Sequence, residues 1–282
     1  MIENFSMNEK EPIKGIIFDI KEFSLHDGPG GRTTVFLKGC PLRCRWCHNP
    51  EGLKKEPQLM VKQSLCKHCG LCRVPCEHPE CKPYGRCIHA CPEGLLSVTG
   101  KEVSAKDLAL QLGKQKDFWI MSGGGVTVSG GEPLLQADFV CELLDLMGNV
   151  HKTIETCGYA SSEDFLRVIS KVDLVLMDIK VADPVRHQEL TGVSNDKILR
   201  NLQLLKESGK AHVLRVPLIP HLTDTEENLK AIAELAGDSP VELLKYNVFA
   251  GAKYDMLGMT YPDIDSHNQE VDLGWFKNAK FG

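Results

Sequence analysis

Apolar positions along the chain alternate between short continuous runs and longer segments with helical periodicity. The short runs predict strands at 15–20, 33–37, 126–128, 153–155, 174–179, 213–218 and 243–248. The amphipathic segments predict helices at 105–116, 134–147, 162–169, 196–208 and 225–235, with Ser104 as the first N-cap and Gly209 ending the fourth helix. This alternation is typical of βα units around a parallel sheet, so we expect an α/β fold.

Polar motifs follow six of these strands at their C-terminal ends, where α/β barrels place active sites. The periodicity does not distinguish an open barrel from a flat, doubly wound sheet. One further strand would be expected where this sequence ends, at the segment VDLGWFKNAKFG.

Composition gives no reason to expect nucleic acid or a membrane as a partner. The 282 residues carry a net charge of −5, with lysine and arginine spread along the chain. The N-terminal segment is polar, unlike a signal peptide, and no apolar run approaches the ~18 residues of a membrane helix. Ten of the twelve cysteines lie between Cys40 and Cys91, a crowding that predicts metal ligands in a reducing cytoplasm.

A loop of three closely spaced cysteines follows the strand at 33–37. Cys40, Cys44 and Cys47 form a C-x3-C-x2-C array bracketed by Pro41 and Pro50. Three thiolates can hold three irons of a [4Fe–4S] cube and leave the fourth iron open for a substrate. A zinc knuckle or three reduced core cysteines are the alternatives.

Residues 57–103 hold seven more cysteines in two runs. The first run has the bacterial ferredoxin spacing; the second places Tyr84 where a cysteine is expected. By crossed ligation, one cluster would use Cys66, Cys69, Cys72 and Cys91. A second would have Cys76, Cys81 and Cys87 alone. That second centre could be a [3Fe–4S] cluster, a [4Fe–4S] cluster with a non-cysteine ligand, or absent, and a zinc module is the alternative for the whole insertion.

Six motifs strengthen the interpretation of the cysteine loop. Trp46 precedes its last cysteine, and the motifs are HDGPGGRTTVFLKGC, HNPEG, SGGEP, IETCGY, MDIK and LRVPLIP. Over roughly residues 14–262 the chain resembles the activating enzymes of glycyl-radical enzymes, a radical S-adenosylmethionine (SAM) family that includes the pyruvate formate-lyase activase. The resemblance implies a partial (β/α)6 barrel built from residues 14–56 and 104–282, interrupted by a ferredoxin-like iron–sulfur insertion at 57–103.

The resemblance also implies an activity and partners. The open iron of the cluster at Cys40, Cys44 and Cys47 would chelate SAM, and reductive cleavage would give a 5′-deoxyadenosyl radical. That radical would take a hydrogen atom from a glycine of a partner glycyl-radical enzyme, with flavodoxin or ferredoxin as electron donor. A radical SAM enzyme acting on a small molecule and a non-catalytic iron–sulfur electron carrier are the rival functions. The HDGPG segment argues against the first, and the cysteine loop with the GGE motif argues against the second.

Several further residues acquire expected roles from the same resemblance. Gly130, Gly131 and Glu132 would bind the amino group of SAM, with Trp46 beside the cofactor. Asp27 would approach the partner's peptide, and Lys180 would lie near SAM or that peptide. Asn247, where the pyruvate formate-lyase activase has histidine, would bind the nucleoside.

The remaining candidates are charged groups at strand ends. Glu155, Thr156 and Asp178 suit a hard cation or an ammonium group, and the resemblance implies a monovalent cation, although the activase has aspartate at the position of Glu155. Arg215 lies in an apolar strand and needs an anionic partner, either the SAM carboxylate or a structural ion pair. Cys141 and Cys157 are expected to be packing residues.

Overall fold

The computed structural model describes residues 11–265, 267 and 270–282. Its main feature is an open nine-stranded sheet with the order β11-β10-β9-β8-β7-β6-β2-β1-β5. The strands are β1 (Lys14–Ser24), β2 (Arg32–Leu37), β5 (Lys101–Ser104), β6 (Gly125–Gly130), β7 (His151–Thr156), β8 (Leu174–Asp178), β9 (His212–Leu218), β10 (Val241–Lys245) and β11 (Ala279–Phe281). The strands from β2 to β11 along this order are parallel, and β1 and β5 extend the sheet antiparallel. The predicted α/β class is confirmed, and the large parallel sheet is consistent with a partial barrel.

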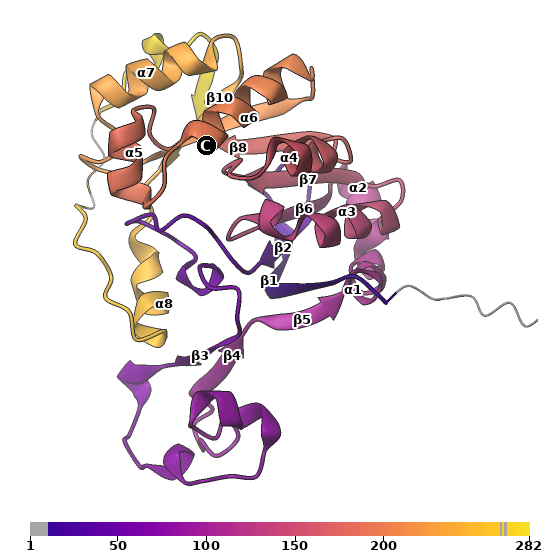
Figure 1. Cartoon of the computed structure of the whole chain (residues 1–282), viewed down its shortest axis with the longest axis vertical. Coiled ribbons are helices and arrows are strands. Elements are labelled where there is room, and N and C mark those ends of the chain that lie inside the picture. The colour runs from indigo at the N-terminus through magenta and orange to yellow at the C-terminus, as the bar shows by residue number, and fades with distance from the viewer. Residues whose placement is uncertain (1–10, 266, 268–269) are drawn as a thin grey trace, which may run out of the picture.

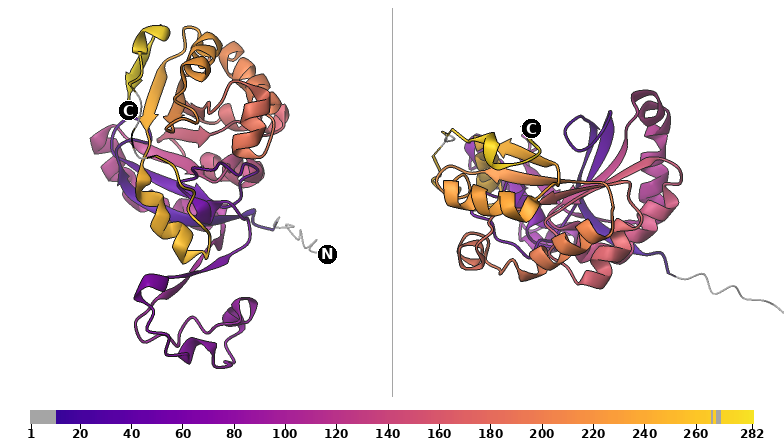
Figure 2. Two further views of the ribbon diagram at one scale, coloured as in Figure 1. Left: turned by 90° about the vertical axis from the view of Figure 1, so that its left-hand side faces the viewer. Right: turned by 90° about the horizontal axis from the view of Figure 1, so that it is seen from above.

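Helices follow most of the parallel strands, as the periodicity predicted (Figure 1). They are α1 (Ala105–Leu112), α2 (Lys116–Ser122), α3 (Ala137–Leu146), α4 (Ser162–Ile169), α5 (Pro184–Thr191), α6 (Asp196–Glu207), α7 (Glu226–Ala236) and α8 (Gly251–Met256). Successive contacts of α1 with α3, α3 with α4 and α4 with α6 form one layer beside the sheet (Figure 2). Ser104 caps α1 as expected, since its hydroxyl accepts the Asp107 N–H at 3.0 Å.

The core lies between this helical layer and the parallel strands. Val35, Val128 and Ile154 on neighbouring strands are fully buried and pack in one cluster with Phe139 and Phe165 of the helices. Strands buried on both faces read as continuous apolar runs, which is why the sequence revealed them. The further strand expected near the end of the chain is β11, which pairs in parallel with β10.

The parallel arrangement brings the C-terminal ends of the motif-bearing strands to one edge of the sheet. The cysteine loop follows β2, the SGGEP loop follows β6, and the IETCGY and MDIK motifs end β7 and β8. This edge is called the rim below.

The cysteine-rich insertion forms a separate lobe below the main sheet (Figure 1). It is joined through an antiparallel pair, β3 (Gln58–Val61) and β4 (Leu96–Thr99). Between them the chain is loop with three short 3-10 helices, η2 (Gln63–Leu65), η3 (Leu71–Arg73) and η4 (Pro79–Tyr84). Residues 101–103, which the sequence assigned to the insertion, lie in β5 and pair with β1 of the main sheet.

In the part of the chain that the structure describes, every helix is too short or too polar to cross a membrane.

Candidate functional site

The cysteine loop is held by backbone hydrogen bonds from both sides. The N–H groups of Gly39 and Cys40 donate to the carbonyls of Gly52 (2.8 Å) and Leu53 (3.1 Å). Farther along, the Arg43 N–H donates to Thr191 O at 2.6 Å, at the C-terminal end of α5. The three thiols are therefore displayed by a loop fixed between two helical turns, and all three are free.

The three thiols are largely shielded from water, and carboxylates as well as the Lys180 ammonium lie near them. Burial raises the pKa of Cys40 and of Cys44 to about 12 and that of Cys47 to about 11, and the Lys180 ammonium lowers all three in opposition. A bound metal deprotonates such thiols outright, because the thiolate is the ligand. Three soft sulfur donors on one loop beside a buried lysine suit an iron–sulfur cluster, so the residues present fit the group that the sequence predicted.

The SGGEP loop packs against the start of the cysteine loop. The Gly131 N–H donates to Leu37 O (2.8 Å) and the Glu132 N–H to Gly39 O (2.7 Å). A Cβ atom on Gly131 would lie 2.3 Å from Gly39 O and 2.5 Å from Gly52 O. The glycine here allows close approach of backbone to backbone, where the sequence suggested close approach to a ligand.

Glu132 is completely buried, and side chains and backbone of the next strand satisfy its carboxylate. It accepts from Thr156 Oγ1 at 2.6 Å and from the Cys157 N–H and Sγ, both at 2.8 Å. Burial raises the pKa of Glu132, and these hydrogen bonds lower it in opposition. Glu132 thus joins the ends of β6 and β7, and Cys157 is a donor to this carboxylate as well as a packing residue.

Charged side chains form a network across β7 to β10. The Arg215 guanidinium pairs with Glu155 at 2.8 Å and Glu242 at 2.9 Å, and donates to the carbonyl oxygen of His26. Ser129 Oγ donates to Glu155 at 2.6 Å. The structural ion pair, one of the two alternatives for Arg215, is therefore present, and sequence reasoning missed Glu242 as a partner.

Asp178 and Lys180 form a second pair on the rim, 2.8 Å apart. Although burial alone would lower it, the pKa of Lys180 is raised because Asp178 and the thiols of Cys44 and Cys157 surround its ammonium. Lys180 therefore stays charged beside the cysteine loop.

The HDGPG segment lies against the first halves of β2 and β6, where Thr127 Oγ1 donates to Asp27 O at 2.8 Å. Thr34 Oγ1 donates to the Asp27 carboxylate at 2.6 Å, and the buried Arg32 donates to Thr127 Oγ1 at 2.8 Å and to Pro29 O at 2.8 Å. Arg32 therefore links this loop to β6. Sequence reasoning did not single out Arg32, although a charged residue opening an apolar strand was a usable signal.

Two predicted cofactor residues have clear surroundings. Trp46 is buried in a small cluster with Val181, Leu190, Ile219 and Tyr246. Asn247 is exposed, and its side chain accepts the Phe249 N–H at 2.9 Å. Trp46 thus anchors the cysteine loop in an apolar pocket, and Asn247 caps the turn after β10.

The short helix α8 contacts the cysteine loop, a contact that no sequence pattern predicted. Tyr254 Oη donates to Cys47 O at 3.0 Å, and Lys253 pairs with Glu51 of the HNPEG motif at 2.6 Å. Contacts over such a separation in sequence depend on the tertiary fold and leave no local pattern.

In the insertion, the first group of cysteines surrounds a cavity of about 300 Å3. Cys66, Cys69, Cys72 and Cys91, the set expected from crossed ligation, all line it. Arg86 Nη2 donates to Cys72 Sγ at 3.0 Å. Hydrogen bonds to ligand sulfurs are among the features that set the potential of a cluster.

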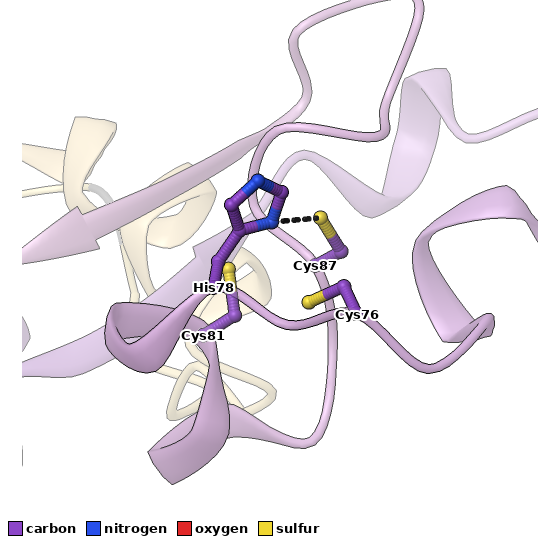
Figure 3. Close-up of side chains that lie close together, drawn as sticks. All are labelled: Cys76, His78, Cys81 and Cys87. Atoms are coloured by element: carbon purple, nitrogen blue, oxygen red, sulfur yellow. Dashed lines mark hydrogen bonds between the residues drawn. The ribbon is translucent and has the colours of Figure 1, made fainter.

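The other group is more compact. Cys76, Cys81 and Cys87 converge with His78, and one donor atom from each lies within 4.8 Å of all the others (Figure 3). His78 was missed, although its position in C-x-H-x2-C was visible in the sequence.

Comparisons with known proteins agree with these features. Residues 34–236 match the family model described as the radical SAM superfamily. The chain is 38% identical over 275 residues to the choline trimethylamine-lyase activating enzyme of Oleidesulfovibrio alaskensis, covering 88% of this chain and 89% of that protein. It is 37% identical over 277 residues to the 4-hydroxyphenylacetate decarboxylase activating enzyme of Clostridium scatologenes, covering 88% of each.

Among solved structures, a domain of the pyruvate-formate lyase-activating enzyme from Bacteroides vulgatus is similar with a TM-score of 0.47 and 27% identity. The match covers 56% of this chain and 99% of that one.

Proposed function

Because the chain belongs to the radical SAM superfamily, and within it to the activating enzymes of glycyl-radical enzymes, we propose that Cys40, Cys44 and Cys47 hold its catalytic [4Fe–4S] cluster at the rim. When bound, this cluster supplies the electron that cleaves SAM to methionine and a 5′-deoxyadenosyl radical, which takes a hydrogen atom from a glycine of the partner enzyme. The observation that carries the proposal is the convergence of the cysteine loop, the SGGEP loop and Lys180 at one edge of the sheet.

The chain's own residues position these reactants. Gly131 and Glu132 hold the SGGEP loop against the cysteine loop through hydrogen bonds, and the backbone of Ser129 and Gly130 in that loop is the proposed contact for the SAM amino group. Lys180 supplies positive charge beside the thiolates. Asp27, on the loop fastened by Arg32, is the proposed contact with the partner's peptide.

Arg215 is the proposed contact for the SAM carboxylate, and it already pairs with Glu155. A SAM carboxylate at this end of the rim would share the guanidinium with Glu155, and Thr156 would stay engaged with Glu132. We do not extend the proposal to a monovalent cation, because Glu155 and Asp178 already face the cationic groups of Arg215 and Lys180.

The insertion is proposed to carry one auxiliary [4Fe–4S] cluster in the cavity lined by Cys66, Cys69, Cys72 and Cys91. Four thiolates at this spacing and a lining that includes Arg86 support it. The ferredoxin-like character of the insertion lies in this ligand set, and a flavodoxin or ferredoxin is the proposed electron donor.

The partner is a glycyl-radical enzyme. Relatives of nearly equal identity, 38% and 37%, are named for a trimethylamine-lyase and a decarboxylase.

The test is anaerobic incubation of the reconstituted protein with a strong reductant and SAM, first alone and then with a glycyl-radical enzyme encoded beside its gene. We expect 5′-deoxyadenosine and methionine in both cases, and a glycyl radical in the electron paramagnetic resonance spectrum of the mixture. SAM cleavage without a radical on any glycyl-radical enzyme tried would contradict the activating function, and no cleavage would contradict the cluster.

A further inference from the structure

We propose that Cys76, His78, Cys81 and Cys87 form a tetrahedral site for a single divalent metal ion, zinc by the chemistry of its donors. The site does not depend on the SAM-binding cluster. It replaces a second iron–sulfur cube in the insertion, and His78 supplies the ligand that the cysteine spacing lacks.

The distances fit one ion better than a cube. Zinc binds thiolate at about 2.3 Å and imidazole at about 2.0–2.1 Å, so a sulfur and a nitrogen on one tetrahedral zinc lie about 3.6 Å apart. His78 Nδ1 lies 3.6 Å from Cys87 Sγ (Figure 3).

In a [4Fe–4S] cube each cysteine binds a different iron, so the ligand sulfurs are spread around the cluster. The cavity group of cysteines has this open arrangement, with about 300 Å3 between its walls. Among the described residues, the compact group of donors within 4.8 Å of one another contains none of those four cysteines. The first group of cysteines therefore has room for a cluster between its side chains, whereas the compact group has room for a single ion.

Backbone conformation and backbone hydrogen bonds position three of the four ligands, His78, Cys81 and Cys87. His78 precedes Pro79, which favours an extended conformation, and its φ of −68° and ψ of 118° are extended. The next turn brings Cys81 back, since the Cys81 N–H donates to His78 O at 3.1 Å. Cys87 is fixed from the other half of the insertion, because its N–H donates to Cys72 O at 2.7 Å.

Neighbouring groups also support this site, in which Cys81 and Cys87 are buried, Cys76 is half-buried and His78 is exposed. The Ile88 N–H donates to Cys81 Sγ at 3.4 Å. The His78 ring packs edge-on against His89 at 4.8 Å between centroids, and His89 is paired with Glu80 at 2.8 Å. Ring packing against His89 restricts the rotation of the His78 imidazole. Four protein ligands leave no open position, as in structural zinc sites.

The experiment measures metals in the full-length protein. Cells are grown with iron and zinc, the protein is purified anaerobically, reconstituted with iron and sulfide, and analysed for both metals. We expect one zinc and about eight irons per chain, four for each [4Fe–4S] cluster. Twelve irons without zinc would overturn the proposal in favour of a histidine-ligated cube, and eight irons without zinc retained would overturn the site itself.

Variants assign the ligands. His78→Ala should lower zinc affinity by more than the 10–100-fold that loss of a supporting contact costs, with the iron content unchanged. His68→Ala is the matched control, because His68 is a histidine of the same insertion that lines the other cavity. It should keep its zinc. Equal zinc in the His78→Ala and wild-type proteins would contradict the role of His78.

Cobalt substitution provides a spectroscopic readout that does not depend on whether His78→Ala folds. Co2+ in the zinc site should show the intense visible bands of a tetrahedral centre with sulfur-to-metal charge transfer. His78→Cys should retain the ion and gain charge-transfer intensity, since three sulfur ligands become four. An octahedral cobalt spectrum, or an identical spectrum in His78→Cys, would overturn the Cys3His assignment.

Discussion

The rim and the insertion both display cysteines, but the protein holds them in opposite ways. The rim loop is fastened by backbone hydrogen bonds to η1 (Pro50–Gly52) and α5, and Trp46 anchors it in an apolar cluster. In the insertion, four residues between 62 and 95 are buried: Cys72, Cys81, Cys87 and Leu95. Three of these four are cysteines, so this lobe has almost no apolar core of its own.

The difference indicates where the folding energy of each region comes from. A short segment without a core is usually stabilised by metals or disulfides, and metal binding then contributes directly to its folding free energy. The rim instead is built on the buried strands of the main sheet, so its loop is arranged before any cluster binds. We therefore expect loss of ligands to affect chemistry at the rim and local folding in the insertion.

The largest expected contrast is between one thiol from each region. Cys40→Ala removes a ligand of the catalytic cluster and should abolish SAM cleavage by a chemical reductant. Cys69→Ala should cost about four irons but leave that cleavage largely intact, because a small reductant can reach the rim directly. Chromatography of 5′-deoxyadenosine measures both variants. Equal loss in the two would show that the rim does not function without the insertion's cluster.

Ion pairs provide the next contrast. Arg215→Ala would leave Glu155 and Glu242 largely buried without their cation, so we expect a loss of about 3–5 kcal/mol in the free energy of unfolding. Lys67→Ala in the insertion breaks a pair with Glu93 whose side chains are 73% and 46% exposed, and should cost no more than about 1 kcal/mol.

Urea denaturation of the Arg215→Ala and Lys67→Ala proteins gives both values. Arg215→Lys keeps the charge but not the forked geometry, and should fall between the wild type and the alanine variant. A cost below about 1 kcal/mol for Arg215→Ala would mean that both carboxylates find other partners or water.

Glycines distinguish the two regions at a smaller scale. Gly131→Ala would place a methyl group against two carbonyl oxygens that belong to the cysteine loop and η1, and should cost about 3 kcal/mol, at the upper end for overpacking. Gly94→Ala in the insertion meets nothing within 4 Å, and its φ of +59° should cost about 1–2 kcal/mol. Thermal unfolding followed by circular dichroism compares them, and a smaller effect for Gly131→Ala would contradict the tight contact.

Local patterns were sufficient for much of this molecule. Most residues at 126–128, 153–155 and 213–218 are β-branched or aliphatic, as strands prefer, and the positions of these segments agree with β6, β7 and β9. The spacing of Cys66, Cys69, Cys72 and Cys91 identified four residues that line one cavity.

Features that depend on contacts between distant segments could not be read in this way. Glu242 meets Arg215 through the register of β9 and β10, and α8 reaches the cysteine loop from more than two hundred residues away. His78 is different, because it lies close to its partners in sequence. The ferredoxin spacing predicts positions for cysteine ligands only, and it identifies Tyr84 as the residue that stands in place of a cysteine. A histidine ligand such as His78 lies outside that spacing, so the spacing does not predict it.

The smallest expected effect concerns acid and the support of the cysteine loop by α5. His187 in α5 is buried, and its Nδ1 lies 2.7 Å from Val193 O and 3.0 Å from Thr191 Oγ1. Burial lowers the pKa of His187 below its ordinary value of about 6.5, and the charge of Lys180 acts in the same direction, while the hydrogen bond to Val193 opposes them. Above this value the histidine is neutral in both the folded and unfolded chain, so stability is unaffected. As the pH falls through about 6.5, the unfolded chain takes up a proton that the folded chain does not, and the free energy of unfolding decreases.

The measurement compares urea denaturation at about pH 7.5 and about pH 5.5, on either side of the unfolded pKa, for the wild type and His187→Gln. Glutamine retains a hydrogen-bond donor but does not titrate, so the variant should lose less stability than the wild type on acidification. Burial also lowers the pKa of His48 and His151, and both are present in each protein, so the difference between the two proteins isolates His187. Because Thr191 O accepts the Arg43 N–H, acid should also loosen the cysteine loop and speed hydrogen exchange at Arg43. An identical pH dependence in the two proteins would mean that His187 accepts its proton without cost in the folded state.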